Sequence, residues 1–84
     1  MLQLLEHESP TQPHDHLDSR ELMRAIAALP ELYRDAVVAV DVVGLSYREA
    51  ARSLRTREAT LTTRLHRGRQ RLAHALLAEE APAA

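Results

Sequence analysis

The stretch from Gly44 to Leu72 constrains the fold more than any other part of this chain, because two segments with helical periodicity follow each other there across a very short connection. In the first segment Ser46 and Glu49 have the spacing of a capping box. Apolar residues then recur at positions i, i+3, i+4 and i+7, namely Tyr47, Ala50, Ala51 and Leu54. This stripe predicts a helix over residues 47–54 with one buried face.

A longer helix is predicted over residues 57–77, with Arg55, Thr56 and Arg57 as the turn and Thr56 as the cap. Its apolar stripe consists of Leu61, Leu65, Gly68, Leu72 and Leu76. At about 100° per residue, the opposite face presents Ala59, Thr63, His66, Arg67, Gln70 and His74. Two helices joined in this way form a helix-turn-helix, and arginines around the exposed faces are typical of a helix that lies in a DNA groove.

Two further helices are predicted before this motif. Asp18 and Glu21 fit the start of a helix over residues 19–28. Pro30 suits the first position of the next helix, whose common face holds Tyr33, Val37, Val40 and Val43, and which ends at Gly44. The Val-rich run 36–43 also suits a buried strand, but no second strand is available to pair with it. We therefore expect an all-α fold: a small four-helix domain with a C-terminal helix-turn-helix and no winged element.

The domain is expected to occupy residues 18–78. Residues 1–17 contain Pro10, Pro13 and many polar side chains, and are predicted to be a flexible leader or interdomain linker. Residues 79–84 are expected to form a disordered tail. A chain of 84 residues makes one small domain, which buries only about 60% of its unfolded surface.

The formal net charge of −1 conceals an uneven distribution. Residues 1–43 carry eight acidic residues and three arginines, whereas residues 44–77 carry eight arginines and two glutamates. A basic C-terminal half indicates an anionic partner for that half. The absence of cysteine excludes disulfides and thiolate metal sites. No apolar run reaches the roughly 18 residues of a membrane span. We therefore expect a cytoplasmic location.

No enzyme is predicted, because no nucleophile and base can be paired from the sequence. The His14, Asp15 and His16 triplet has ligating side chains, but a metal site needs further ligands in fixed positions. We therefore expect no metal and no cofactor.

The stretch ALPELYRDAVVAVDVVGLSYREAARSL, followed by TRLHRGRQRL, resembles region 4 of extracytoplasmic-function sigma factors, bacterial RNA polymerase subunits of the sigma-70 family. The resemblance covers residues 19–77. Its most specific parts are Ala28-Leu29-Pro30, Gly44-Leu45-Ser46-Tyr47 with Glu49-Ala50-Ala51, and Arg64-Leu65-His66-Arg67 with Arg69. It implies a four-helix domain whose last helix enters the major groove of the −35 promoter element. It also implies docking on the β-subunit flap of the polymerase core and, as a further partner, an anti-sigma factor.

The chain departs from the family pattern between Arg55 and Thr63, where the family usually has Gly-Ile-Pro-x-Gly-Thr-Val, a basic residue and Ser. Arg55 in place of glycine puts a side chain at a left-handed position, at a cost of about 1 kcal/mol. Thr56 replaces an apolar residue of the turn. Thr62 replaces a basic residue that contacts DNA in the family, so we do not assign a DNA contact to Thr62. Arg57 is a candidate substitute for that contact.

Within the fourth helix, exposure and the resemblance together predict base contacts from Thr63, His66 and Arg67. Phosphate contacts are predicted from Arg52, Arg55, Arg57, Thr60, Arg64, Arg69 and Arg71. Four to six such contacts would give a log–log salt slope of about −4 to −5. Partner docking is assigned to Leu22, Ile26, Leu29, Val38 and Val42.

Two alternatives remain from the sequence. In one, the domain is mainly a protein-docking module for the β flap or an anti-sigma factor. In the other, it is the output domain of a LuxR-type response regulator, which shares a GLSxxEhA-like pattern and would bind a palindrome as a dimer. The preceding Ala-Leu-Pro and the Arg-Leu-His-Arg ending argue against the latter.

Overall fold

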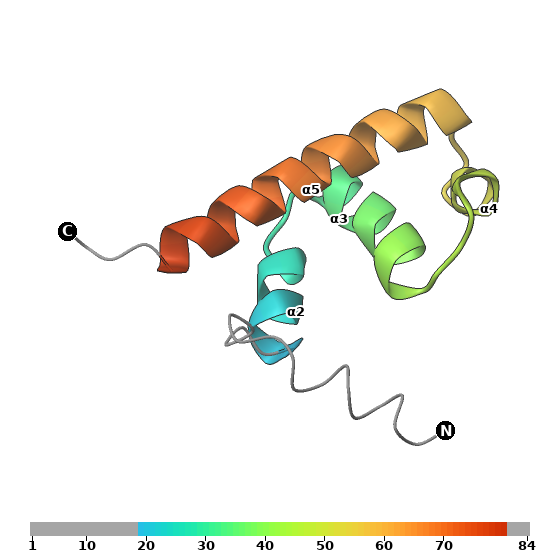
Figure 1. The fold of residues 1–84 in the computed structure, drawn as a ribbon. Helices are drawn as coiled ribbons and strands as arrows, with labels where there is room; N and C mark the ends of the chain where they lie inside the picture. Colours follow the sequence, from blue (N-terminus) through green and yellow to red (C-terminus); the bar gives the residue numbers. More distant parts are fainter. Residues whose placement is uncertain (1–18, 81–84) are drawn as a thin grey trace, which may run out of the picture.

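The chain is all-α in the computed structural model, which describes the backbone of residues 19–80 and the side chains of residues 19–78. Helix α2 spans Ser19–Ala27, and α3 spans Glu31–Val37 and continues directly into a π-helical turn, η1 (Val38–Val42). Helix α4 spans Tyr47–Ser53, and α5 spans Glu58–Glu80 (Figure 1). The described part of the chain contains no strand, so the expected four-helix architecture without a wing is confirmed.

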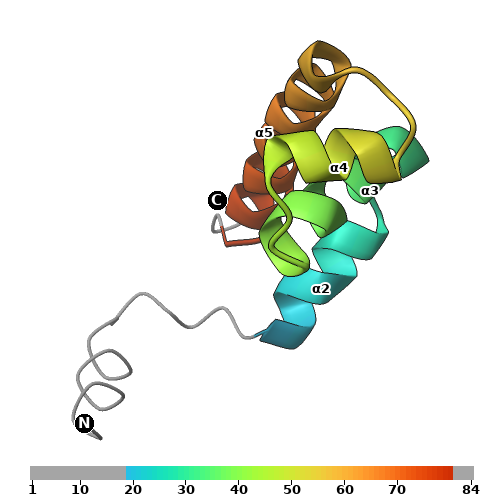
Figure 2. The same ribbon diagram turned by 90° about the vertical axis from the view of Figure 1, so that its right-hand side faces the viewer.

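Helix α5 is the spine of the domain. Helices α2, α3 and α4 all pack against it, and Figures 1 and 2 show them on one side of α5, with its other side left uncovered by the described helices. Leu61 and Leu65 of α5 are 0% and 1% exposed, at the centre of a core completed by Ile26, Leu29, Ala36, Val37, Ala39, Ala50 and Ala51. The centres of the predicted stripes are confirmed, because Ala50, Ala51, Leu61, Leu65 and Gly68 are buried, and Leu54, Leu72 and Leu76 are half-buried. Tyr47, predicted on the buried face of α4, is 39% exposed, so its place in the stripe is wrong.

Gly68 sets the distance between α3 and α5. A Cβ atom at this position would lie 2.8 Å from Cγ2 of Val37 and 3.1 Å from the carbonyl oxygen of Tyr33. Both distances are shorter than van der Waals contact, so the two helices approach this closely only because residue 68 has no side chain.

The second helix differs from the prediction at both ends. Pro30 has ψ 145°, an extended conformation, so it precedes α3 as the N-cap and does not occupy the first helical position. Near the C-terminal end, the Val43 N–H donates to the carbonyl of Val38, five residues back, in the wider hydrogen-bonding pattern of a π-turn. The wider turn rotates Val43 away from the core, where it is 63% exposed, so its predicted place on the buried face is wrong. Gly44, with φ 92°, ends this helix as predicted.

Helix α4 begins with the predicted capping box. The Glu49 N–H donates to Ser46 Oγ (3.0 Å), and the Ser46 N–H donates to Glu49 Oε1 (2.9 Å). Because the carboxylate accepts this backbone hydrogen bond, the pKa of Glu49 is lowered from its ordinary value.

The turn between α4 and α5 is a Schellman motif. The Arg55 N–H donates to the Arg52 carbonyl and the Thr56 N–H to the Ala51 carbonyl, which closes α4. Arg55 has φ 56°, so the predicted left-handed conformation is confirmed. The predicted cap at Thr56 is wrong, because α5 begins only at Glu58 and the Leu61 N–H donates to the carbonyl of Arg57.

Some expectations lie outside the described residues: the cap at Asp18, the leader 1–17, the His14 to His16 triplet and residues 81–84 of the tail. Helix α5 extends to Glu80, three residues beyond its expected end.

Candidate nucleic-acid interface

The uncovered side of α5 presents the three predicted base-reading residues. Thr63, His66 and Arg67 are all exposed, and they lie on successive turns of one helical face, opposite Leu61 and Leu65. The Thr63 hydroxyl donates to the carbonyl of Ala59 (3.1 Å). With its hydrogen used within the helix, the Thr63 oxygen is left to accept a hydrogen bond, for example from a base amino group.

Exposed arginines surround the N-terminus of α5. Arg52 lies in the last turn of α4, Arg55 in the turn, and Arg57 directly before α5; all three are exposed and form no ion pair with other described residues. Thr60 and Arg64, one and two turns into α5, are half-buried. The guanidinium groups of Arg52, Arg55 and Arg57 can each bind phosphate oxygens through two parallel hydrogen bonds.

The other two predicted phosphate contacts have intramolecular partners. Arg69 forms a two-bond ion pair with Asp41 of η1, with Nη2 to Oδ1 at 2.7 Å and Nε to Oδ2 at 3.0 Å. Hydrogen bonding to Asp41 raises the pKa of Arg69 above its ordinary value, with a smaller contribution in the same direction from Tyr47. The Arg71 guanidinium carbon lies 5.1 Å from the centre of the Tyr33 ring, in cation–π geometry.

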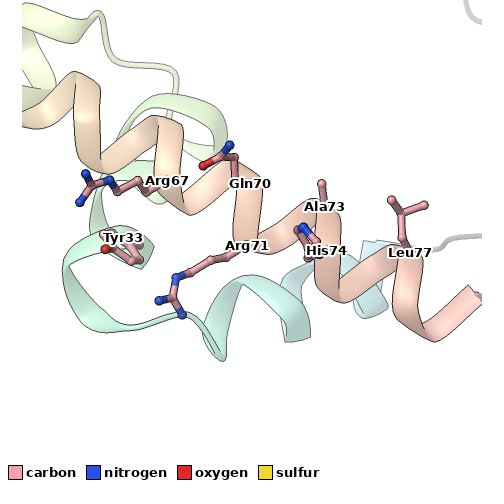
Figure 3. A pocket seen from close by; sticks show the side chains of 7 residues that line it. All are labelled: Tyr33, Arg67, Gln70, Arg71, Ala73, His74 and Leu77. Atoms are coloured by element: carbon pink, nitrogen blue, oxygen red, sulfur yellow. The ribbon is translucent and has the colours of Figure 1, made fainter.

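Two open hollows lie between α3 and α5. One, of about 430 Å³, is bordered by Leu32 and Tyr33 of α3 and by Thr60, Thr63, Arg64 and Arg67 of α5. The other, of about 850 Å³, is lined by Tyr33, Arg67, Gln70, Arg71, His74 and Leu77 (Figure 3). Tyr33 borders both, although sequence reasoning assigned it only to the core. No sequence signal identifies Tyr33 as a site residue. It lies close to the arginines because α3 packs against α5, and the sequence pattern does not specify that packing.

The five predicted docking residues do not form one exposed surface. Ile26 and Leu29 are only 4% and 9% exposed and belong to the core, and Val38 is half-buried against it. Leu22 of α2 and Val42 of η1 are exposed, at 37% and 47%.

The described residues contain no cluster of three or more His, Asp or Glu side chains that could hold a metal ion. No helix in this part of the chain has the length and apolar character needed to cross a membrane.

The chain is similar to known proteins over most of its length. Residues 19–72, which include α2, α3, η1, α4 and the first part of α5, match the family model described as "Sigma-70, region 4". The chain is also 41% identical over 68 residues to a curated protein named "ECF RNA polymerase sigma factor SigE" from Mycolicibacterium smegmatis. This alignment covers 77% of the chain and 26% of the relative, so the chain spans about a quarter of that protein's length. The chain therefore belongs to the region 4 family of sigma-70 factors, on the extracytoplasmic-function branch that its sequence resembles.

Proposed function

We propose that this domain reads the −35 element of bacterial promoters in the cytoplasm, as the region 4 part of a sigma factor that directs transcription initiation. The observation that carries the proposal is the two-sided character of α5. One side, centred on Leu61 and Leu65, is in the core, and on the other side no element among residues 19–80 covers Thr63, His66 and Arg67. A recognition helix needs this division, because it must be held by its own domain and still reach base edges.

Within this interface, Arg67 has the best chemistry for sequence reading, since a guanidinium can bind guanine O6 and N7 together. His66 and Thr63 lie beside it and supply further hydrogen-bonding groups. Arg52, Arg55, Arg57, Thr60 and Arg64 bind phosphates and set the register of the helix in the groove. Arg69 is left out of this set, because Asp41 already neutralises its charge and occupies the Nε–Nη2 edge of its guanidinium.

Docking on the polymerase core is proposed as a companion role. Large apolar residues remain exposed on three elements, namely Leu22 and Met23 on α2, Val42 and Val43 in and after η1, and Tyr47 on α4, and they are the proposed contacts. The β flap is the proposed partner, with an anti-sigma factor as a competitor for the domain. The match to region 4 does not favour the response-regulator alternative.

The test is selection of randomised duplex DNA by the 84-residue chain, followed by affinity measurements over a range of salt concentrations. We expect an asymmetric enriched motif and a loss of roughly 10-fold or more for Arg67→Ala on that motif. Arg34→Ala is the matched control, because it also removes one positive charge but Arg34 lies on α3, paired with Asp35. Binding without sequence preference, or equal losses for both variants, would contradict base reading by α5. A palindromic motif bound by a dimer would support the response-regulator alternative instead.

A further inference from the structure

The two hollows between α3 and α5 lie next to each other, because Tyr33 and Arg67 border both of them. We call the two hollows together the seam. It follows one flank of α5, from Thr60 near the helix start to Leu77. Leu32 and Tyr33, which come from outside the helix-turn-helix, form its α3 side.

The charge of the seam indicates what it holds. Arg64, Arg67 and Arg71 lie along its α5 wall, and none of the described residues that line either hollow is acidic. An anionic chain therefore fits it best. Thr63 and Arg67 belong both to the seam and to the base-reading face, so a duplex that presents its base edges to them must carry one of its backbones past this flank of α5.

We propose that the seam holds the sugar–phosphate backbone of one DNA strand, and that Tyr33 contacts it from outside the helix-turn-helix. This inference rests on the proposed function and adds a contact surface that the motif alone does not contain. The exposed Leu32 side chain packs against the sugars, and the Tyr33 hydroxyl donates to a phosphate oxygen.

The geometry around Tyr33 supports this role. Figure 3 shows its ring between the side chains of Arg67 and Arg71. The Arg71 guanidinium carbon lies 5.1 Å from the ring centre, which restricts the long arginine side chain before DNA arrives. Gly68 allows this arrangement, because a Cβ atom there would lie 3.3 Å from Cβ of Tyr33. The same close crossing that packs the core therefore places a phenol and an arginine side by side on the DNA-facing flank.

Leu32→Asp tests the seam directly. Leu32 is 54% exposed, so the change leaves the core intact while placing a negative charge against the proposed phosphates. We expect affinity for the selected duplex to fall roughly 10-fold, and for unrelated duplexes in similar proportion, because backbone contacts carry no sequence information. Met23→Asp is the matched control. It makes the same change of charge at a residue that is 46% exposed on α2, away from the seam. Equal losses for the two variants would overturn the inference.

Tyr33→Phe tests the hydroxyl alone, since it keeps the ring and the contact with Arg71. We expect affinity to fall about threefold to tenfold, with unchanged thermal stability. An unchanged affinity would overturn the phosphate contact by Tyr33. If the parent chain binds no duplex, the proposed function itself fails. If the parent binds and Leu32→Asp behaves like Met23→Asp, only the seam is wrong.

Discussion

Arg69 and Asp41, which are 28 positions apart in the chain, are joined by two hydrogen bonds between one guanidinium and one carboxylate. The pair connects η1 to the flank of α5 that lies opposite the seam. It therefore links η1 to α5 at the protein surface, beside the core contacts of Leu61 and Leu65, and it occupies one edge of the Arg69 guanidinium.

Breaking this pair should lower stability by a small amount. Both side chains are more than a third exposed, so we expect a coupling energy of about 0.5–1 kcal/mol between Asp41→Asn and Arg69→Gln. A double-mutant cycle in urea unfolding measures it. Additive effects of the two changes would show that the pair contributes nothing to folding.

Asp41→Asn also has an expected effect on DNA binding. It releases Arg69, so the salt slope of duplex binding should become steeper by about 1. Asp35→Asn is the control, because it releases Arg34 from the corresponding pair on α3. A slope that changes equally in both variants would show that net charge, and not the release of Arg69, causes the effect.

Arg55→Gly should stabilise the domain. Arg55 has φ 56° at the position after α4 where glycine is preferred, and relief of this strain should add about 0.5–1 kcal/mol to the free energy of unfolding. The same change removes a proposed phosphate contact, so duplex affinity should fall while the melting temperature rises. Arg57→Gly is the control, since Arg57 is not among the residues with positive φ. A fall in stability for Arg55→Gly would contradict the account of strain.

Gly68→Ala should destabilise the domain, although alanine is the better helix former by about 1 kcal/mol. The new methyl group would lie 2.8 Å from Val37 Cγ2 and 3.1 Å from a backbone oxygen. Overpacking of this kind costs about 1–3 kcal/mol, which exceeds the gain in helix propensity. The urea midpoint measures the result. Val37→Ala should cost less in the Gly68→Ala background than alone, since it removes the nearest clash; additive losses would contradict the close crossing as the cause.

The capping box should make part of the stability depend on pH. Glu49 has a lowered pKa in the folded chain, so its contribution is present above its unfolded value near 4.5 and is lost as the pH falls through the folded value. Glu49→Gln should therefore reduce the loss of stability between pH 6 and pH 3, measured by urea unfolding at each pH. An identical pH profile for the variant and the parent would be inconsistent with a stabilising carboxylate at this position.

Periodicity and capping signals predicted the helices well. Ser46 with Glu49, the stripe through Leu61 and Leu65, and the break at Gly44 are local signals, and local hydrogen bonding decides them. The departures have another origin. The π-turn at Val38–Val42 changes the helical period, so a valine pattern interpreted at 3.6 residues per turn could not show that Val43 is exposed.

The candidate site was predictable only in part. Exposure of Thr63, His66 and Arg67 follows from a helical wheel. The partners of Arg69 and Arg71 do not, because Asp41 and Tyr33 come from another helix whose rotation the sequence does not specify. Leu29 shows the same limit, since an apolar side chain in the short connection between α2 and α3 can serve a core or a surface, and here it is in the core.

The one-sided packing of α5 bears on how such domains diverge. Positions 61, 65 and 68 are buried in the core and tolerate little change, whereas the side chains at positions 63, 66 and 67 are exposed and lie outside the core. Under the proposed function, new target sequences arise by substitution at these outward positions without compensating change in the core, so that one scaffold serves many sets of genes.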